Sequence, residues 1–273
     1  GGNMCQAIVG GLIAQGMAAH DVHVIEPVAE ARAALARLGV SSAAVVVPAD
    51  LAAAVIVLAV KPQAMQIAIA PLAGRLVSQL VVSIAAGIQC RELANWLGAG
   101  PRAYANLVRA MPNTPALIRA GISGLFAMPA VTAADRQAAE NLLGAVGETA
   151  WFAQESMLDA VTAVSGSGPA YVFYFIEALE RAALEMGFEQ PVARKFALQT
   201  FLGGAKLAAG SSESPDVLRQ RVTSRRGTTE RAIETFDALA LKQHIVQGVK
   251  AACERSRELG EEMRLAAADG SKA

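Results

Sequence analysis

The sequence predicts an α/β protein: a Rossmann-type, doubly wound and mostly parallel sheet followed by an all-helical domain. In the first part of the chain, short β-branched apolar runs alternate with alanine-rich segments of helical periodicity. This alternation is typical of parallel strands that helices cover on both faces. After about residue 155 only long helical patterns follow. We therefore expect residues 1–155 to form a dinucleotide-binding domain, and residues 156–273 to form a helical dimerisation and substrate domain.

Each expected element is bounded by turn residues. In the first domain we expect strands within residues 21–27, 53–60, 79–87, 102–110, 123–127 and 148–153, and helices over residues 29–39 and 132–147. In the second domain we expect helices over residues 169–187, 191–210 and 215–224, and one or two more over residues 228–260. Prolines near the starts and glycines at the ends support these helices. They are more apolar than a solvated face requires, which indicates either an ordinary core or burial against another subunit. The last nine residues, 265–273, look disordered.

Composition narrows the possible function. The 273 residues include 24 basic and 24 acidic ones, so the net charge is zero and nothing favours nucleic acid or an anionic membrane surface as a partner. No continuous apolar span of about 20 residues and no signal peptide are present. Cys5, Cys90 and Cys253 are odd in number and widely spaced, which favours reduced thiols in the cytoplasm. No Cys/His cluster indicates a metal site.

The first residues, GGNM, precede an apolar helical run. In a dinucleotide fold the first turn reads G-x-G-x-x-G/A and lets the backbone approach the pyrophosphate. Gly2 would be the second glycine of that turn and Cys5 would occupy its small third position, so a strand and the first glycine are expected before Gly1. From these residues alone, a remnant of a cleaved tag is an alternative. Glu26 follows the next strand, where such folds place an acid on the adenosine ribose.

Three further stretches indicate a site. In RAMPNTPAL (residues 109–117), two prolines hold a turn from which Asn113 can present its amide to a ligand. In VSGSGPAYV (residues 164–172), small residues before a helix leave N–H groups open to close approach. In VTSRRGTTE (residues 222–230), a second glycine-containing helix start is followed by Glu230, which suits a capping role. Simple helix capping is the commoner explanation of such helix starts.

The ordered set GGNM, LAVKPQ, SIAAGI, RAMPNTPAL, SGSGPAY and GTTE resembles the pyrroline-5-carboxylate reductase family over nearly the whole chain. The resemblance implies reduction of the imine of 1-pyrroline-5-carboxylate to L-proline, in proline biosynthesis, by hydride transfer from NADPH or NADH. It also implies a homodimer through the helical domain, further assembly into a ring of dimers, and a site that draws on two chains.

The resemblance also implies roles for individual residues. Those implied for the cofactor are Gly2, Asn3 and Met4 at the pyrophosphate, Ala59, Val60, Lys61 and Pro62 beside the adenosine and nicotinamide, and Ala85, Ala86 and Asn113 near the nicotinamide ring. Those implied for the substrate are the N–H groups of Gly227, Thr228 and Thr229 at its carboxylate, with the Thr229 hydroxyl at the ring nitrogen as the catalytic group. Glu26 is expected to bind the ribose, so NADH should serve better than is usual in the family, although Arg32 could reach a 2′-phosphate.

Two other functions stay open. A related imine or 3-hydroxyacid dehydrogenase is disfavoured because the hydroxyacid type usually carries a lysine on the long interdomain helix, and residues 169–186 contain none. A non-catalytic dinucleotide sensor or scaffold is disfavoured by the retained GTTE. It stays possible because Ser224-Arg225-Arg226-Gly227 departs from the S-P-G-G or S-K-G-G usual in the family.

Overall fold

The computed structural model describes the backbone of residues 2–270 and the side chains of residues 2–265. Within these residues the chain divides into two compact units. The sheet unit comprises the described parts of Gly1–Ser167 and Ala252–Ala273, and the helical unit comprises Gly168–Ala251. Residues 156–167 and the end of the last helix thus pack with the sheet, although the sequence pattern groups them with the helices.

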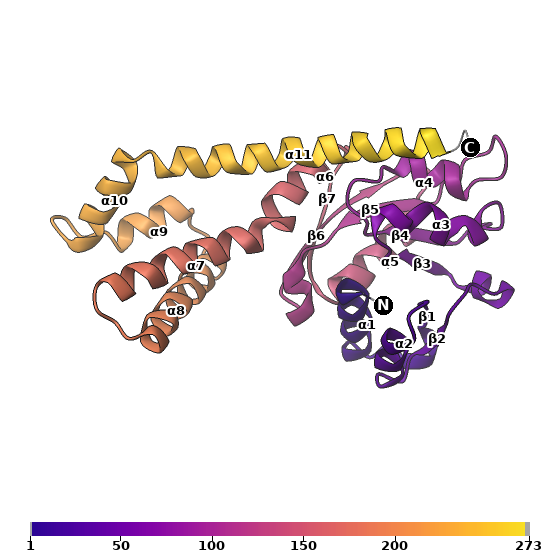
Figure 1. The fold of residues 1–273 in the computed structure, drawn as a ribbon, viewed down its shortest axis with the longest axis horizontal. Coiled ribbons are helices and arrows are strands. Elements are labelled where there is room, and N and C mark those ends of the chain that lie inside the picture. Colours follow the sequence, from indigo (N-terminus) through magenta and orange to yellow (C-terminus); the bar gives the residue numbers. More distant parts are fainter. Residues whose placement is uncertain (1, 271–273) are drawn as a thin grey trace. The chain divides into compact units, whose positions relative to one another are not determined.

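Except for β2, which no apolar run predicts, the strands of the sheet unit lie close to where the apolar runs predict them (Figure 1). They are β1 (His23–Ile25), β2 (Ser41–Ala43), β3 (Val55–Leu58), β4 (Leu80–Ser83), β5 (Leu107–Met111), β6 (Gly121–Ala127) and β7 (Gly147–Trp151). β1 and β2 pair in parallel as a two-stranded sheet, and the other strands form a five-stranded sheet in the order β3-β4-β5-β6-β7. Only the β5–β6 pair of this sheet is antiparallel. The expectation of a mostly parallel sheet is confirmed.

Helices cover both faces of the five-stranded sheet, because successive strand residues point to opposite sides. On one face, Leu80 and Val82 join a core cluster with α1 (Asn3–Ala14) and α5 (Ala133–Gly144). On the other face, Val81 and Leu107 join a cluster with α3 (Met65–Ile69) and α4 (Cys90–Leu97). A smaller cluster packs α1 against α2 (Ala29–Ala36) beside the two-stranded sheet. The helices therefore complete the doubly wound layers that the sequence predicts.

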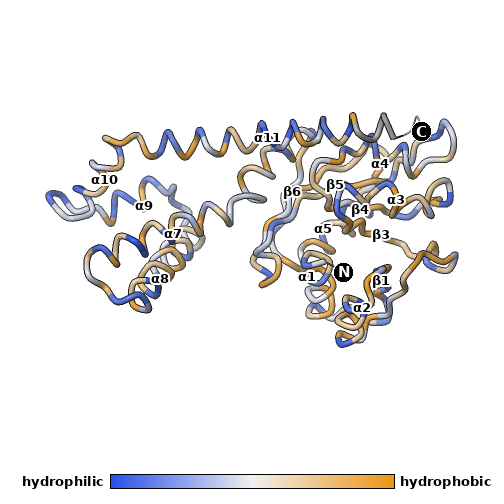
Figure 2. Tube along the Cα trace, viewed as in Figure 1, coloured by the Kyte–Doolittle hydropathy of each residue, from blue (hydrophilic) through white to orange (hydrophobic). Residues whose placement is uncertain are grey.

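The helical unit contains α7 (Gly168–Glu185), α8 (Gln190–Ala209), α9 (Pro215–Arg221), α10 (Thr228–Ala238) and the first part of α11 (Leu241–Gly270). Helices α7 and α8 pack on each other. Figure 2 shows that apolar residues recur along both of them. Much of that apolar surface lies on the outside of this single chain, since Phe173, Tyr174 and Phe196 are all more than half exposed.

The end of the chain differs from its expectation. Helix α11 continues to Gly270, so the backbone of residues 265–270 is helical where the composition suggested disorder. Residues 271–273, like Gly1, lie outside the described residues. The helix persists because alanine and leucine, which favour helices, dominate its last turns.

Candidate active site

A pocket of about 250 Å³ lies in the sheet unit, where the start of α1 meets the carboxyl ends of β3 and β4. The residues that line it are Gly2, Asn3, Met4 and Cys5 from α1, Ala59, Val60, Lys61 and Pro62 after β3, and Ile84, Ala85 and Ala86 after β4. All of the cofactor residues predicted at these three chain segments therefore line one cavity. Cys5 and Ile84 add to the wall.

The start of α1 makes the pocket suited to an anion. Gly2 is the N-cap residue and, without a side chain, makes no capping bond of its own at this helix end. The first N–H groups of a helix have no partner within it and carry the positive end of the helix dipole. A methyl group at Gly2 would meet nothing within 4 Å, so a ligand has open access to this backbone. The geometry fits the pyrophosphate of a dinucleotide.

Burial raises the pKa of the Cys5 thiol. This thiol therefore stays protonated and uncharged near neutral pH, and it adds no negative charge beside the helix start.

Glu26 lies directly after β1, at the turn into α2. Its Oε1 accepts a hydrogen bond of 2.7 Å from the N–H of Val28, the N-cap residue of α2. Arg32 turns back to the same turn, because its Nη1 donates to the carbonyl oxygens of Glu26 and Pro27 at 2.8 and 2.7 Å. The carboxylate therefore sits at the start of α2, and the guanidinium is held by backbone oxygens. Glu26 is not among the residues that line the pocket at α1.

Asn113 does not present its amide to this pocket. Its Nδ2 donates to the carbonyl of Ser165 at 3.1 Å, and its Oδ1 accepts from the N–H of Ile122 at 2.9 Å. The side chain is 9% exposed. It ties the turn between β5 and β6 to the segment after α6 (Met157–Val161), so the two prolines hold a structural bridge where the sequence suggested a ligand contact.

The small residues before α7 are not a free helix start. Helix α6 runs on into a π-helical turn over Thr162–Gly166, and α7 follows at Gly168. A methyl group at Gly166 would lie 2.8 Å from Cε of Met111, so the glycine allows this turn to pack on the end of β5. The expected open N–H groups of VSGSGPAYV are thus replaced by a continuing helix.

The start of α10 does keep the predicted character of a helix start. Gly227 is its N-cap residue and has no side chain that could cap the helix, and its N–H donates to the carbonyl of Ser224 at 3.0 Å. Thr228 and Thr229 occupy the first turn, with Thr229 half-buried. Glu230 reaches back to accept a hydrogen bond of 2.5 Å from the N–H of Arg226, the residue before the N-cap, so its carboxylate holds the loop at the helix start. Arg226 itself has a left-handed backbone (φ 60°).

Sequence reasoning missed one buried ion pair. Arg109 on β5 is 4% exposed, and its Nη1 lies 3.0 Å from Oε1 of Glu155. The same oxygen accepts a hydrogen bond of 2.7 Å from the N–H of Cys90, at the start of α4. Burial and the nearby Glu155 raise the pKa of the Cys90 thiol. The signal that could have revealed this network is a charged residue inside an otherwise apolar strand, Leu107–Met111.

Comparison with known proteins supports the pattern of both units. Residues 155–259 match the family model described as pyrroline-5-carboxylate reductase dimerisation. Residues 1–87 match the one described as NADP oxidoreductase coenzyme F420-dependent. The pyrroline-5-carboxylate reductase of Pseudomonas aeruginosa is 46% identical over 268 residues, which cover 96% of this chain and 95% of that protein.

Solved structures of pyrroline-5-carboxylate reductases are also similar to this chain. A pyrroline-5-carboxylate reductase from Coxiella burnetii has a TM-score of 0.87 and 36% identity, over 94% of this chain and 95% of that one. The Plasmodium falciparum enzyme, solved with NADP bound, has a TM-score of 0.79 and 25% identity, over 95% of each chain. The chain belongs to the pyrroline-5-carboxylate reductase family.

Family membership confirms the expected fold and function. The reaction is the NAD(P)H-dependent reduction of 1-pyrroline-5-carboxylate in proline biosynthesis, and the second part of the chain is a dimerisation domain. In the described residues no helix is both long and apolar enough to cross a membrane.

One departure from the usual reductase sequence has a visible consequence. Arg226 occupies the position where S-P-G-G or S-K-G-G supplies a glycine, and it adopts the left-handed backbone that glycine favours. The loop before α10 therefore keeps the glycine-type conformation with an arginine in place. The side chains of Arg225 and Arg226 are exposed, so their added positive charges lie in solvent.

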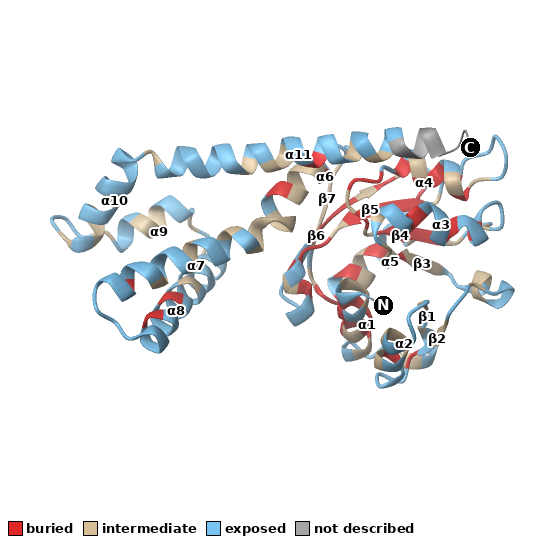
Figure 3. Ribbon diagram, viewed as in Figure 1, coloured by how far each residue is buried: buried red, intermediate tan, exposed pale blue. Residues whose placement is uncertain are grey.

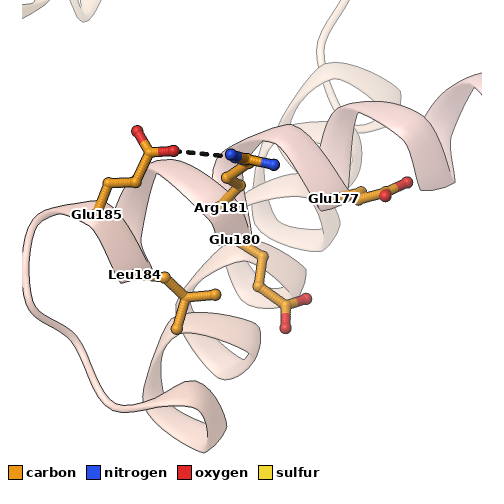
Figure 4. A pocket seen from close by; sticks show the side chains of 5 residues that line it. All are labelled: Glu177, Glu180, Arg181, Leu184 and Glu185. Atoms are coloured by element: carbon orange, nitrogen blue, oxygen red, sulfur yellow. Dashed lines mark hydrogen bonds and ion pairs between the residues drawn. The ribbon is translucent and has the colours of Figure 1, made fainter.

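A larger and more open hollow, of about 450 Å³, follows the exposed side of α7 in this reductase (Figure 4). Glu177, Glu180, Arg181, Leu184 and Glu185 line it, and Arg181 pairs with Glu185 one helical turn away. None of the predicted site residues belongs to it. It is a solvated helix side and lacks the convergent groups of the pocket at α1.

Proposed function

We propose that the pocket at the start of α1 holds the nicotinamide cofactor. The observation that carries this is the meeting of an uncapped helix start with the carboxyl ends of two parallel strands in one cavity. Gly2, Asn3 and Met4 bind the pyrophosphate through first-turn N–H groups. Residues 59–62 line the adenosine and nicotinamide side, with the positive charge of Lys61 near the phosphates, and Ala85 and Ala86 give the ring a small apolar wall.

The start of α10 binds the substrate. The first-turn N–H groups of Thr228 and Thr229 donate to the substrate carboxylate, as the positive end of a helix favours an anion. Gly227, whose own N–H donates to the carbonyl of Ser224 at 3.0 Å, is the small N-cap residue beside them. The ring N–H of the protonated imine donates to the hydroxyl oxygen of Thr229, which favours the electrophilic form. The bound cofactor supplies the hydride, so the chain itself needs to bind, orient and exclude water.

Assembly and location complete the proposal. The reductase forms homodimers through the helical unit, and the dimers associate further into a ring. It works in the cytoplasm without a nucleic-acid or membrane partner. The balanced charge of the sequence and three free cysteines support this setting.

The decisive experiment tests the substrate role of Thr229. We expect Thr229→Ala to lower kcat/KM for 1-pyrroline-5-carboxylate by about 5- to 150-fold, because one hydrogen bond in the transition state contributes about 1–3 kcal/mol. Cofactor affinity should stay unchanged. Loss of absorbance of the reduced cofactor measures turnover.

Two matched variants make this test specific. Thr229→Ser keeps the hydroxyl and should retain most activity. Thr235→Ala changes another threonine of α10, whose hydroxyl donates to the carbonyl of Arg231, and should behave as wild type. Unchanged kinetics in Thr229→Ala would place the substrate elsewhere, and collapse of cofactor affinity would assign Thr229 to the nicotinamide. Absence of turnover in the wild type would favour the sensor or scaffold function.

Cofactor preference tests the position of Glu26. A carboxylate at the start of α2 can accept the ribose hydroxyls of NADH and repels a 2′-phosphate. We expect Glu26→Ser to raise kcat/KM for NADPH by about tenfold, roughly the effect of removing one close like-charge pair, and to lower it for NADH. Asp21→Ser, on an exposed residue before β1, is the control. No gain with NADPH would show that Glu26 does not face the ribose.

A further inference from the structure

The loop after β4 has two sides. Ile84, Ala85 and Ala86 line the pocket at α1. Ala85 and Ile88 also belong to the core cluster on the α3–α4 face of the sheet. Gly87 lies between them, buried, with a left-handed backbone (φ 80°). The position of this pocket wall therefore depends on what packs against the other side of the loop.

The end of α11 packs there. A methyl group at Gly87 would lie 2.9 Å from Sδ of Met263, and one at Gly260 would lie 3.2 Å from the carbonyl oxygen of Gly87. The two glycines let the helix and the loop approach backbone to backbone. Met263 packs on the same core cluster that contains Ala85 and Ile88. One short path of contacts thus runs from α11 through the loop to the pocket wall.

A buried hydrogen bond fixes this part of α11 to the sheet unit. Ser256, which is 8% exposed, donates through Oγ to Oδ1 of Asp159 on α6 at 2.9 Å. Ser256, Gly260 and Met263 recur at the spacing of one or two helical turns, so they share one face of α11. The flank of the helix beside this face carries exposed ion pairs such as that of Arg255 with Glu262. The helix therefore has one face built for this contact.

We propose that the face of α11 formed by Ser256, Gly260 and Met263 positions the loop 84–88 and so sets the affinity of the pocket for the nicotinamide cofactor. These are positioning residues, since they act through Gly87 and Ala85. Helix α11 is continuous from Leu241 and follows α10 after a short turn. In the sequence it therefore begins next to the substrate-binding helix. The inference rests on the proposed cofactor role of the pocket.

The test compares variants of α11 in the full-length enzyme. Met263→Ala removes the side chain that packs behind the loop, and Gly260→Leu separates helix and loop. We expect Met263→Ala to raise the KM and Kd for NADH and NADPH about fivefold, equivalent to about 1 kcal/mol, with kcat at saturating cofactor nearly unchanged. The effect of Gly260→Leu should be larger. Enhancement of reduced-cofactor fluorescence measures Kd without turnover.

Two controls separate positioning from general stability. Met263→Leu keeps the volume and should restore wild-type Kd. Leu265→Ala, on an exposed residue of the same helix, should change neither Kd nor KM. An unchanged Kd in folded Met263→Ala, or an equal rise in Leu265→Ala, would overturn the inference. A wild-type enzyme that binds no cofactor would instead overturn the proposed function, and this inference with it.

Discussion

The two units of this reductase bury their apolar residues in opposite ways (Figure 3). The sheet unit has large, fully buried side chains such as Leu93, Leu107 and Leu125. In the helical unit, Gly168–Ala251, the buried residues are three alanines, Ala183, Ala193 and Ala197. Its large apolar side chains are mostly exposed in the single chain. The sheet unit is thus a self-contained scaffold, whereas the helical unit has a core only when another surface covers it.

The match to a dimerisation domain explains this difference. An obligate homodimer interface resembles a domain core cut in half. The high apolar content of these helices, which the sequence could ascribe either to an ordinary core or to a subunit contact, therefore belongs to the second case. Their stability is inseparable from protein concentration.

The largest expected effect is loss of the dimer through a substitution in the helical unit. Phe173 on α7 is 67% exposed in the single chain, and we expect Phe173→Asp to convert the dimer to a monomer with reduced helix content. A charge buried without a partner at an interface costs several kcal/mol. Light scattering after size-exclusion chromatography measures the assembly.

The matched control lies in the sheet unit. Val77 is 86% exposed in the turn before β4, and Val77→Asp should leave the assembly unchanged. If Phe173→Asp stays dimeric at the same concentration, Phe173 lies outside the interface and the exposed face of α7 is covered by something else.

The sequence predicted the architecture of the sheet unit correctly, but not every strand and strand direction within it. Buried strands such as Leu80–Ser83 are continuous apolar runs, which are recognisable without any knowledge of their neighbours. The short strand Ser41–Ala43 carries no such signal, because it is exposed or half-buried and, among the described strands, pairs with β1 alone. The antiparallel β5–β6 pair also escaped prediction, since strand direction depends on the turn at Asn113.

The candidate site shows the same limit. The glycine turn and the strand end at Lys61 were predictable from the residues, because the fold brings glycine turns and strand ends together. The place of Ala85 in the site came from the resemblance to the family. The partners of Asn113 were not, because Ser165 lies far along the chain and no local rule links them. The same holds for Gly87 and Met263, which meet only once α11 returns to the sheet unit.

The second largest expected effect is a loss of folding stability in the sheet unit. Leu107 is fully buried at the start of β5, the middle strand of the five-stranded sheet, and Leu107→Ala should lower the free energy of unfolding by about 2–5 kcal/mol through lost contacts and a residual cavity. Assembly should persist in the folded protein. Chemical denaturation followed by circular dichroism measures the loss. Ile67→Ala, on an 81% exposed residue of α3, should cost less than about 0.5 kcal/mol. Equal losses would mean that the sheet unit is not the self-contained scaffold described above.

The smallest effect sharpens the comparison at a single residue of the helical unit. Arg226 holds a left-handed backbone, which strains any residue with a side chain and which glycine adopts freely. We expect Arg226→Gly to stabilise the loop before α10 by about 0.5–1 kcal/mol, since the relief of strain exceeds the added entropy of the unfolded chain. The midpoint of thermal unfolding, measured at constant protein concentration, should rise by a few degrees.

The control is Arg225→Gly, because it removes an equal charge at the neighbouring residue, whose backbone is not left-handed. There the flexibility of glycine has no strain to relieve, so Arg225→Gly should lower the same midpoint. Opposite signs at two adjacent arginines would show that backbone strain, and not charge, decides the stability of this loop. A rise in both variants would instead show that repulsion between the two guanidinium groups dominates. In that case the arginines themselves, more than the lost glycine, would distinguish this loop from the S-P-G-G and S-K-G-G loops usual in the family.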